Sequence, residues 1–281
     1  MNPRQYFTLG RIIDKNYFTN KLIILITIFS LVAGSVINLV NGVNLTDATF
    51  SGLIFALIAF FTWALAREIY PQGEYAALIA SLLSVVVIFF LEQYPMIIPV
   101  ILWFIMALRF INQTTGLKPT IIDRSIIIIF TFFVSYLFSW IFFAMLILVF
   151  SINYFISKQK NDVVFTIISI LSLLIFIIFR GIWYNHVFVS LNNFIIISMI
   201  SLVFLITMFL VRNIRVICDN TDEKVSITRI YCAQILITFF CLIFVIWFGD
   251  EGFIMLTPVW CIFICSIILS PMHLIKKNHD L

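Results

Sequence analysis

The most informative absence in this chain is charge. Only 11% of the 281 residues are charged and 63% are hydrophobic, whereas soluble domains carry roughly 25% charged residues. A soluble core cannot bury so much apolar surface, so a large soluble fold is excluded. The formal net charge of +4 is spread over short loops, which also excludes nucleic acid as a partner.

Metal ligands and catalytic motifs are scarce as well. The chain has three histidines, five cysteines and no CxxC pair. Cys261 and Cys265 share a helix face and would supply half of a metal site, but buried free cysteine usually acts as a small packing residue. The sequence also lacks GxSxG, HExxH, Walker and paired DxxD motifs. We therefore predict no metal and no cofactor.

What the sequence does have is a series of long apolar runs, which are typical of membrane-spanning helices. They predict an all-α integral membrane protein, a polytopic bundle of about ten transmembrane helices. No segment between the runs is long enough for a separate domain, so we expect residues 1–281 to form a single transmembrane domain. The predicted spans are 22–40, 49–66, 76–91, 95–110, 124–138, 140–157, 163–179, 193–211, 230–248 and 253–270.

The apolar run over residues 125–157 allows either one span or two. One helix would be about 50 Å long, against a hydrocarbon core of about 30 Å. With a reversal near residues 138–140, every basic residue except Arg180 falls in an inner segment, as the positive-inside rule requires. A single span would divide the basic residues almost equally between the two sides. We therefore predict ten spans, with the N- and C-termini cytoplasmic.

Two local patterns concern helix packing. Ser30, Gly34 and Asn38 recur every four residues in the first span, which predicts close contact with a neighbouring helix. Pro99 and Pro258 fall inside the predicted spans 95–110 and 253–270, where proline is expected to kink a helix.

An outer site is predicted around the sequence RGIWYNH, which begins at Arg180. The forked guanidinium of Arg180 suits phosphate or carboxylate, and His186 can titrate near neutral pH. We expect Asp47 or Asp250 as a carboxylate partner. The alternative is an arginine that extends to the membrane surface beside the interfacial aromatic residues Trp183 and Tyr184.

Asp47, in the first outer loop, is a candidate catalytic base. The alternative is that Thr46 or Asp47 caps the next helix, which is a common role for these residue types. At the inner side, Arg67, Arg109 and Arg124 are candidate binding residues for a phosphate or a lipid head group. The alternative there is membrane anchoring together with an Arg–Asp pair.

Two protein families resemble parts of this pattern. Ten short spans with both termini inside resemble the drug/metabolite transporter superfamily in architecture, although its motifs are not matched. The stretch LAREIYPQGEYAALIASLL after Asp47 is similar to multi-span glycosyltransferases that use lipid-linked sugars. This second resemblance implies catalysis by an acidic residue of the first outer loop, but that loop is short here, at residues 41–48.

These observations leave three hypotheses for a protein of a prokaryotic cytoplasmic membrane. The first is a carrier or flippase for a small or amphipathic anionic compound. The second is a lipid-phosphate-dependent, glycosyltransferase-like membrane transferase that uses Asp47 and Arg180. The third is a non-catalytic subunit of a membrane complex. The expected partners are the lipid bilayer and a lipid or anionic small-molecule ligand.

Overall fold

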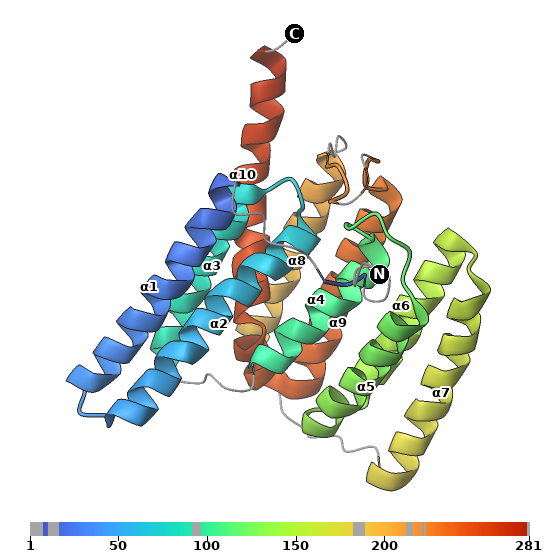
Figure 1. The fold of residues 1–281 in the computed structure, drawn as a ribbon, viewed down its shortest axis with the longest axis horizontal. Coiled ribbons are helices and arrows are strands. Elements are labelled where there is room, and N and C mark those ends of the chain that lie inside the picture. Colours follow the sequence, from blue (N-terminus) through green and yellow to red (C-terminus); the bar gives the residue numbers. More distant parts are fainter. Residues whose placement is uncertain are drawn as a thin grey trace, which may run out of the picture. The chain divides into compact units, whose positions relative to one another are not determined.

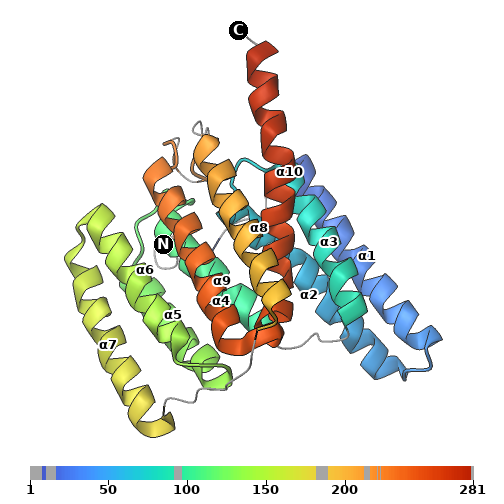
Figure 2. The same cartoon turned by 180° about the vertical axis from the view of Figure 1, so that it is seen from behind.

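The computed structural model describes residues 8–10, 17–91, 97–181, 189–211, 216–219, 221 and 223–279, and these residues are mostly helical (Figures 1 and 2). The one strand-like feature among them is an isolated bridge between Ile217 and Lys224. The predicted all-α class is therefore confirmed for the described part of the chain. Its helices are α1 (Phe18–Val40), α2 (Leu45–Ile69), α3 (Glu74–Leu91), α4 (Ile97–Asn112), α5 (Ile121–Leu137), α6 (Ile141–Ser157), α7 (Lys160–Arg180), α8 (Leu191–Leu210), α9 (Ile227–Met255) and α10 (Thr257–His279).

Each of the ten predicted spans overlaps one of these helices. Within the described residues, six helices are long and apolar enough to cross a membrane: α1, α2, α3, α7, α8 and α9. Helices α4, α6 and the Thr257–Ser270 part of α10 are apolar but shorter. The chain thus has the helices of a multi-pass membrane protein. The number of crossings and the sides of the termini remain predictions.

The long apolar run 125–157 divides where the sequence predicts, because α5 ends at Leu137 and α6 begins at Ile141. Near the starts of α5 and α7, Arg124 lies 2.7 Å from Asp162. At the other ends of the same helices, Arg180 donates to the carbonyl of Tyr136 at 2.9 Å. Contacts at both ends make α5 and α7 parallel, so α6 runs in the opposite direction between them in sequence.

The contacts divide the chain into two compact units that interleave along the sequence. The first unit contains α5, α6 and α7, with residues 103–112 of α4, residues 227–252 of α9 and the short segment 8–10. The second unit contains α1, α2, α3 and α10, with most of α8. Whether the whole chain acts as one transmembrane domain stays a prediction.

Aromatic side chains fill the core of the first unit. The Phe104 and Phe240 rings meet edge to face at 4.8 Å, and Phe142 lies edge-on to Trp103 at 5.2 Å. The indole nitrogen of Trp103 donates to the Thr131 hydroxyl at 2.9 Å, so its one polar atom is satisfied inside the core. These contacts join α4, α5, α6 and α9.

In the second unit, α1 and α2 approach closely where each carries a glycine. A Cβ added to Gly34 would lie 2.6 Å from the Phe55 ring, and one added to Gly52 would overlap the Leu31 carbonyl oxygen and the Ser35 hydroxyl. Gly34 is buried against α2, as the small-residue pattern predicts. Both positions therefore require glycine because the backbones meet there.

Two of the local expectations are wrong. Pro99 and Pro258 do not kink helix interiors, since they lie in the first turns of α4 and α10. Proline is tolerated there because the first N–H groups of a helix have no partner inside the helix. The break near the end of α9 falls instead at Gly249, whose φ of 63° favours glycine.

A substitution at Gly52 tests the close contact between α1 and α2. We expect Gly52→Leu to lower the free energy of unfolding by about 1–3 kcal/mol, because the added side chain must push the helices apart. Thr49→Leu adds similar bulk on the exposed side of α2 and is the matched control. Thermal unfolding in detergent measures the difference, and equal stability of the two variants would contradict the packing.

Candidate functional site

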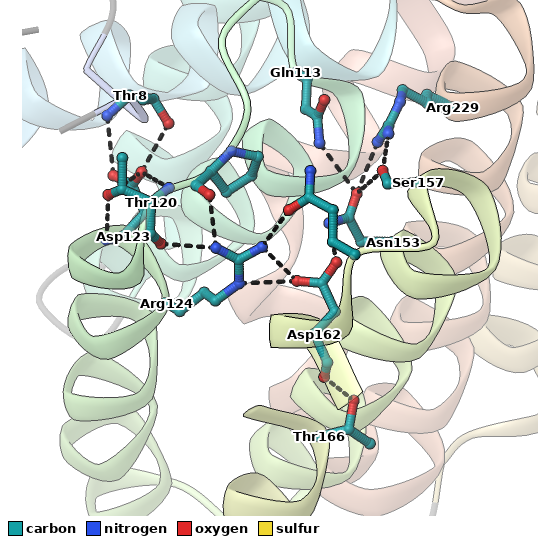
Figure 3. Close-up of polar contacts among 12 residues, drawn as sticks. Thr8, Gln113, Thr120, Asp123, Arg124, Asn153, Ser157, Asp162, Thr166 and Arg229 are labelled. Atoms are coloured by element: carbon teal, nitrogen blue, oxygen red, sulfur yellow. Dashed lines mark hydrogen bonds and ion pairs between the residues drawn. The ribbon is translucent and has the colours of Figure 1, made fainter. Parts of the chain in front are cut away.

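A buried ion pair joins the first turns of α5 and α7 (Figure 3). Arg124 is 1% exposed, and its Nη2 and Nε lie 2.7 Å and 2.8 Å from the same oxygen of Asp162. Its other bonds go to the carbonyls of Pro119 and Thr120, at 2.6 Å and 3.0 Å, and to Oε1 of Gln159 at 2.6 Å. All five N–H donors of this guanidinium therefore have acceptors within the chain.

The network continues from Asp162 to α6, α4 and α9 through Asn153, as Figure 3 shows. The amide nitrogen of Asn153 donates to the second oxygen of Asp162 at 2.8 Å. Its amide oxygen accepts from Gln113 at 3.1 Å, from Arg229 at 2.8 Å and from Ser157 at 3.2 Å. Arg229 also donates to the Ser157 hydroxyl. One buried asparagine thus links the ends of four helices.

The energetics favour a positioning role for this network. A buried pair gains little net stability, but removal of one partner leaves a buried charge and typically costs about 3–5 kcal/mol. Arg124, a predicted residue of the inner anion site, has no donor left for a ligand in this arrangement. The alternative for the inner residues included an Arg–Asp pair, and the structure identifies Asp162 as the aspartate.

The segment 8–10 packs onto the same end of the first unit. The backbone N–H and hydroxyl of Thr8 donate to the two oxygens of Asp123, at 3.0 Å and 2.7 Å. Asp123 also forms a capping box with Thr120 at the start of α5. Arg109, another predicted inner residue, donates to the carbonyl of Leu9 at 3.0 Å. Arg109 and Arg124 thus lie in one unit, and both donate hydrogen bonds to backbone carbonyls.

Arg180 lies at the opposite end of α7 from Asp162. Its Nη2 donates to the carbonyl of Tyr136 at 2.9 Å, and its guanidinium carbon lies 4.2 Å from the centre of the Tyr136 ring. The last carbonyls of a helix have no partner inside it, and a cation there interacts favourably with the helix dipole. Arg180 therefore caps the end of α5. Within the described residues, no carboxylate pairs with it.

The expected neighbours of Arg180 are only partly visible. His186, Trp183 and Tyr184 lie outside the described residues. Asp250 accepts from the backbone N–H of Ser190 at 3.2 Å and from the amide of Asn193 at 2.9 Å. The contacts of Asp250 therefore join the start of α8 to the end of α9.

The remaining predicted residues, Asp47 and Arg67, belong to the second unit. Asn44 caps α2, since its side chain accepts from the Asp47 N–H at 2.9 Å and donates to the Asp47 carboxylate at 2.7 Å. The expected cap at Thr46 or Asp47 is therefore wrong, because the helix begins earlier, at Leu45. Arg67 pairs with Glu74 at 3.0 Å across the turn between α2 and α3.

Three of the five cysteines are buried packing residues. Cys241, Cys261 and Cys265 are free and buried, in agreement with the sequence prediction for the pair 261 and 265. In the loop before α9, burial raises the pKa of the Cys218 thiol, which disfavours the reactive thiolate. Among the described residues, no group of three or more potential ligands is placed to hold a metal ion.

Three residues of the network, Asp162, Asn153 and Arg229, were not among the candidates predicted from the sequence. One signal was available, because Asp162 is the single acidic residue in the run from 158 to 180 and stands directly before an apolar stretch. A carboxylate at that position needs a cationic partner on a neighbouring helix. No such signal marks Asn153, since asparagine is also common near helix ends for local reasons.

Comparisons with known proteins add no assignment: no protein family, no curated protein and no solved structure matches the chain. Neither of the two resemblances noted in the sequence gains support from them.

A double-mutant cycle tests the positioning role of the ion pair. We expect Arg124→Met and Asp162→Leu each to lower the free energy of unfolding by about 3–5 kcal/mol, because each leaves a buried charge alone. The double variant should be more stable than either single variant. Thermal unfolding in detergent gives the values, with Lys118→Met as an exposed control. Strictly additive effects would show that the two side chains do not act as a pair.

Proposed function

We propose that the protein is a carrier or flippase for an amphipathic anionic compound in a prokaryotic cytoplasmic membrane. The observation that supports this most is Arg180, an exposed guanidinium with no carboxylate partner among the described residues. The contact with Tyr136 uses one of its N–H donors. The remaining fork of donors suits phosphate or carboxylate.

The surroundings of Arg180 favour an amphipathic ligand over a purely polar one. The two residues before it, Ile178 and Phe179, are 79% and 85% exposed. Exposed apolar side chains beside a cation match a molecule with an anionic head and an apolar chain. The ring of Tyr136 beneath the guanidinium fixes one face of the cation and leaves its edge for the anion.

A carrier also needs binding residues at the inner side of the membrane. Each of the predicted inner residues has a partner inside its own unit: Arg109 donates to the Leu9 carbonyl in the first unit, and Arg67 pairs with Glu74 in the second. Arg124 is assigned a positioning role, since all its donors are engaged.

The transferase hypothesis gains no specific support. Its candidate base, Asp47, holds the cap of its own helix through Asn44. A subunit role remains the alternative if the purified chain moves no substrate.

Lipid flipping in reconstituted vesicles tests the proposal. The probe is head-group-labelled phosphatidylglycerol in phosphatidylcholine vesicles, with an impermeant reductant that bleaches the outer leaflet. We expect the wild-type protein to expose inner-leaflet probe and Arg180→Gln to slow this roughly tenfold or more, because one charge-assisted hydrogen bond is worth about 1.5–3 kcal/mol. Arg180→Lys should retain part of the rate, since it keeps the charge.

The control removes a different positive charge. Lys118→Gln changes an exposed lysine in the loop between α4 and α5, at the other end of the first unit, and should flip lipid at the wild-type rate. Equal rates for Arg180→Gln and wild type would contradict the role of Arg180. No acceleration by the wild-type protein would contradict the flippase function for this class of lipid.

A further inference from the structure

The turn between α6 and α7 presents two cations without carboxylate partners. Lys158 and Lys160 are both exposed, and neither pairs with a carboxylate in the described part of the chain. The nearest acidic residue in the sequence, Asp162, is fully buried, and its oxygens accept hydrogen bonds from Arg124 and Asn153. The two lysine charges are therefore not neutralised locally.

The residue between the two lysines in the sequence, Gln159, has an amide donor without an acceptor. Oε1 of Gln159 accepts from Arg124 at 2.6 Å, which fixes the orientation of the amide group. Its nitrogen is consequently turned away from Arg124 and is buried, with no hydrogen-bond acceptor among the described residues. A buried donor of this kind is favourable only when an acceptor reaches it.

Apolar surface begins directly beside the same turn. Nζ of Lys158 lies 5.6 Å from the ring centres of both Tyr154 and Phe155, and Phe155 is 68% exposed. Lys160 lies at the start of α7, and positions 164, 167 and 171 follow it on the same face of the helix. They form an apolar stripe. These three residues, Val164, Ile167 and Leu171, are each 53% exposed.

We propose that this turn binds the phosphate group of an anionic phospholipid. Lys158 and Lys160 hold the phosphate, the Gln159 amide donates to one of its oxygens, and an acyl chain lies along Val164, Ile167 and Leu171. A free phosphate shares the head-group chemistry but makes no use of the apolar stripe. Charge complementarity together with adjacent apolar surface therefore favours the lipid. The site does not depend on the proposed carrier activity.

Native mass spectrometry of the full-length protein in a nonionic detergent tests this site. Phosphatidylglycerol is added as the anionic probe and phosphatidylcholine as the zwitterionic one. We expect phosphatidylglycerol to bind wild type preferentially, and Lys158→Gln/Lys160→Gln to bind it roughly tenfold or more weakly. Lys158→Arg/Lys160→Arg should bind like wild type, which shows that the loss follows charge. Thermal unfolding checks that each variant is folded.

The matched control is Lys21→Gln/Lys224→Gln, which removes two other exposed lysines and should leave phosphatidylglycerol binding unchanged. Equal loss in this control would overturn the site, as would unchanged binding in Lys158→Gln/Lys160→Gln. Inorganic phosphate is added as a competitor. If millimolar phosphate displaces all the bound phosphatidylglycerol, the turn is an anion site and not a lipid site. Persistence of the lipid supports the contribution of the apolar stripe.

Discussion

The buried ion pair between Arg124 and Asp162 is the contact on which the arrangement of the first unit depends. Charged groups removed from water must find partners inside the chain, and here each partner comes from a different helix. Asn153 extends the pair to α6 and, through Gln113 and Arg229, to α4 and α9. The ends of five helices are thereby joined by one hydrogen-bonded network.

At the other end of α5, the polar groups that need partners are backbone carbonyls. The reversal between α5 and α6 is short and leaves carbonyls at the end of α5 without helical partners. Arg180 supplies a donor from the end of α7. The pair at one end and the cap at the other hold α5 parallel to α7. A structural contact and a binding function are compatible here, because the contact uses one donor of the fork.

Hydropathy was sufficient to predict the helices because polar groups are costly to bury in lipid. Charge placement was sufficient to predict the division of residues 125–157 because basic residues favour the cytoplasmic loops. The close helix contact at Gly34 was also predicted, from the four-residue spacing of small residues in the first span. The partner of Arg124 was not, since pairing depends on how each helix is rotated about its axis, which an almost uniformly apolar sequence leaves undetermined. The proline positions were misjudged because helix ends shift by a few residues, and that shift separates a kink from a first turn.

The ten-span topology requires that α4, α5 and α6 each cross the membrane, so that six crossings separate the turn after α1 from the start of α8. Cysteines placed singly at Asn41, Leu191 and Lys158, in a background without the five native cysteines, test it with an impermeant maleimide on intact cells. We expect labelling at positions 41 and 191 without permeabilisation, and at 158 only after it. Labelling of 41 but not of 191 on intact cells would mean an odd number of crossings between them and would contradict the ten-span topology.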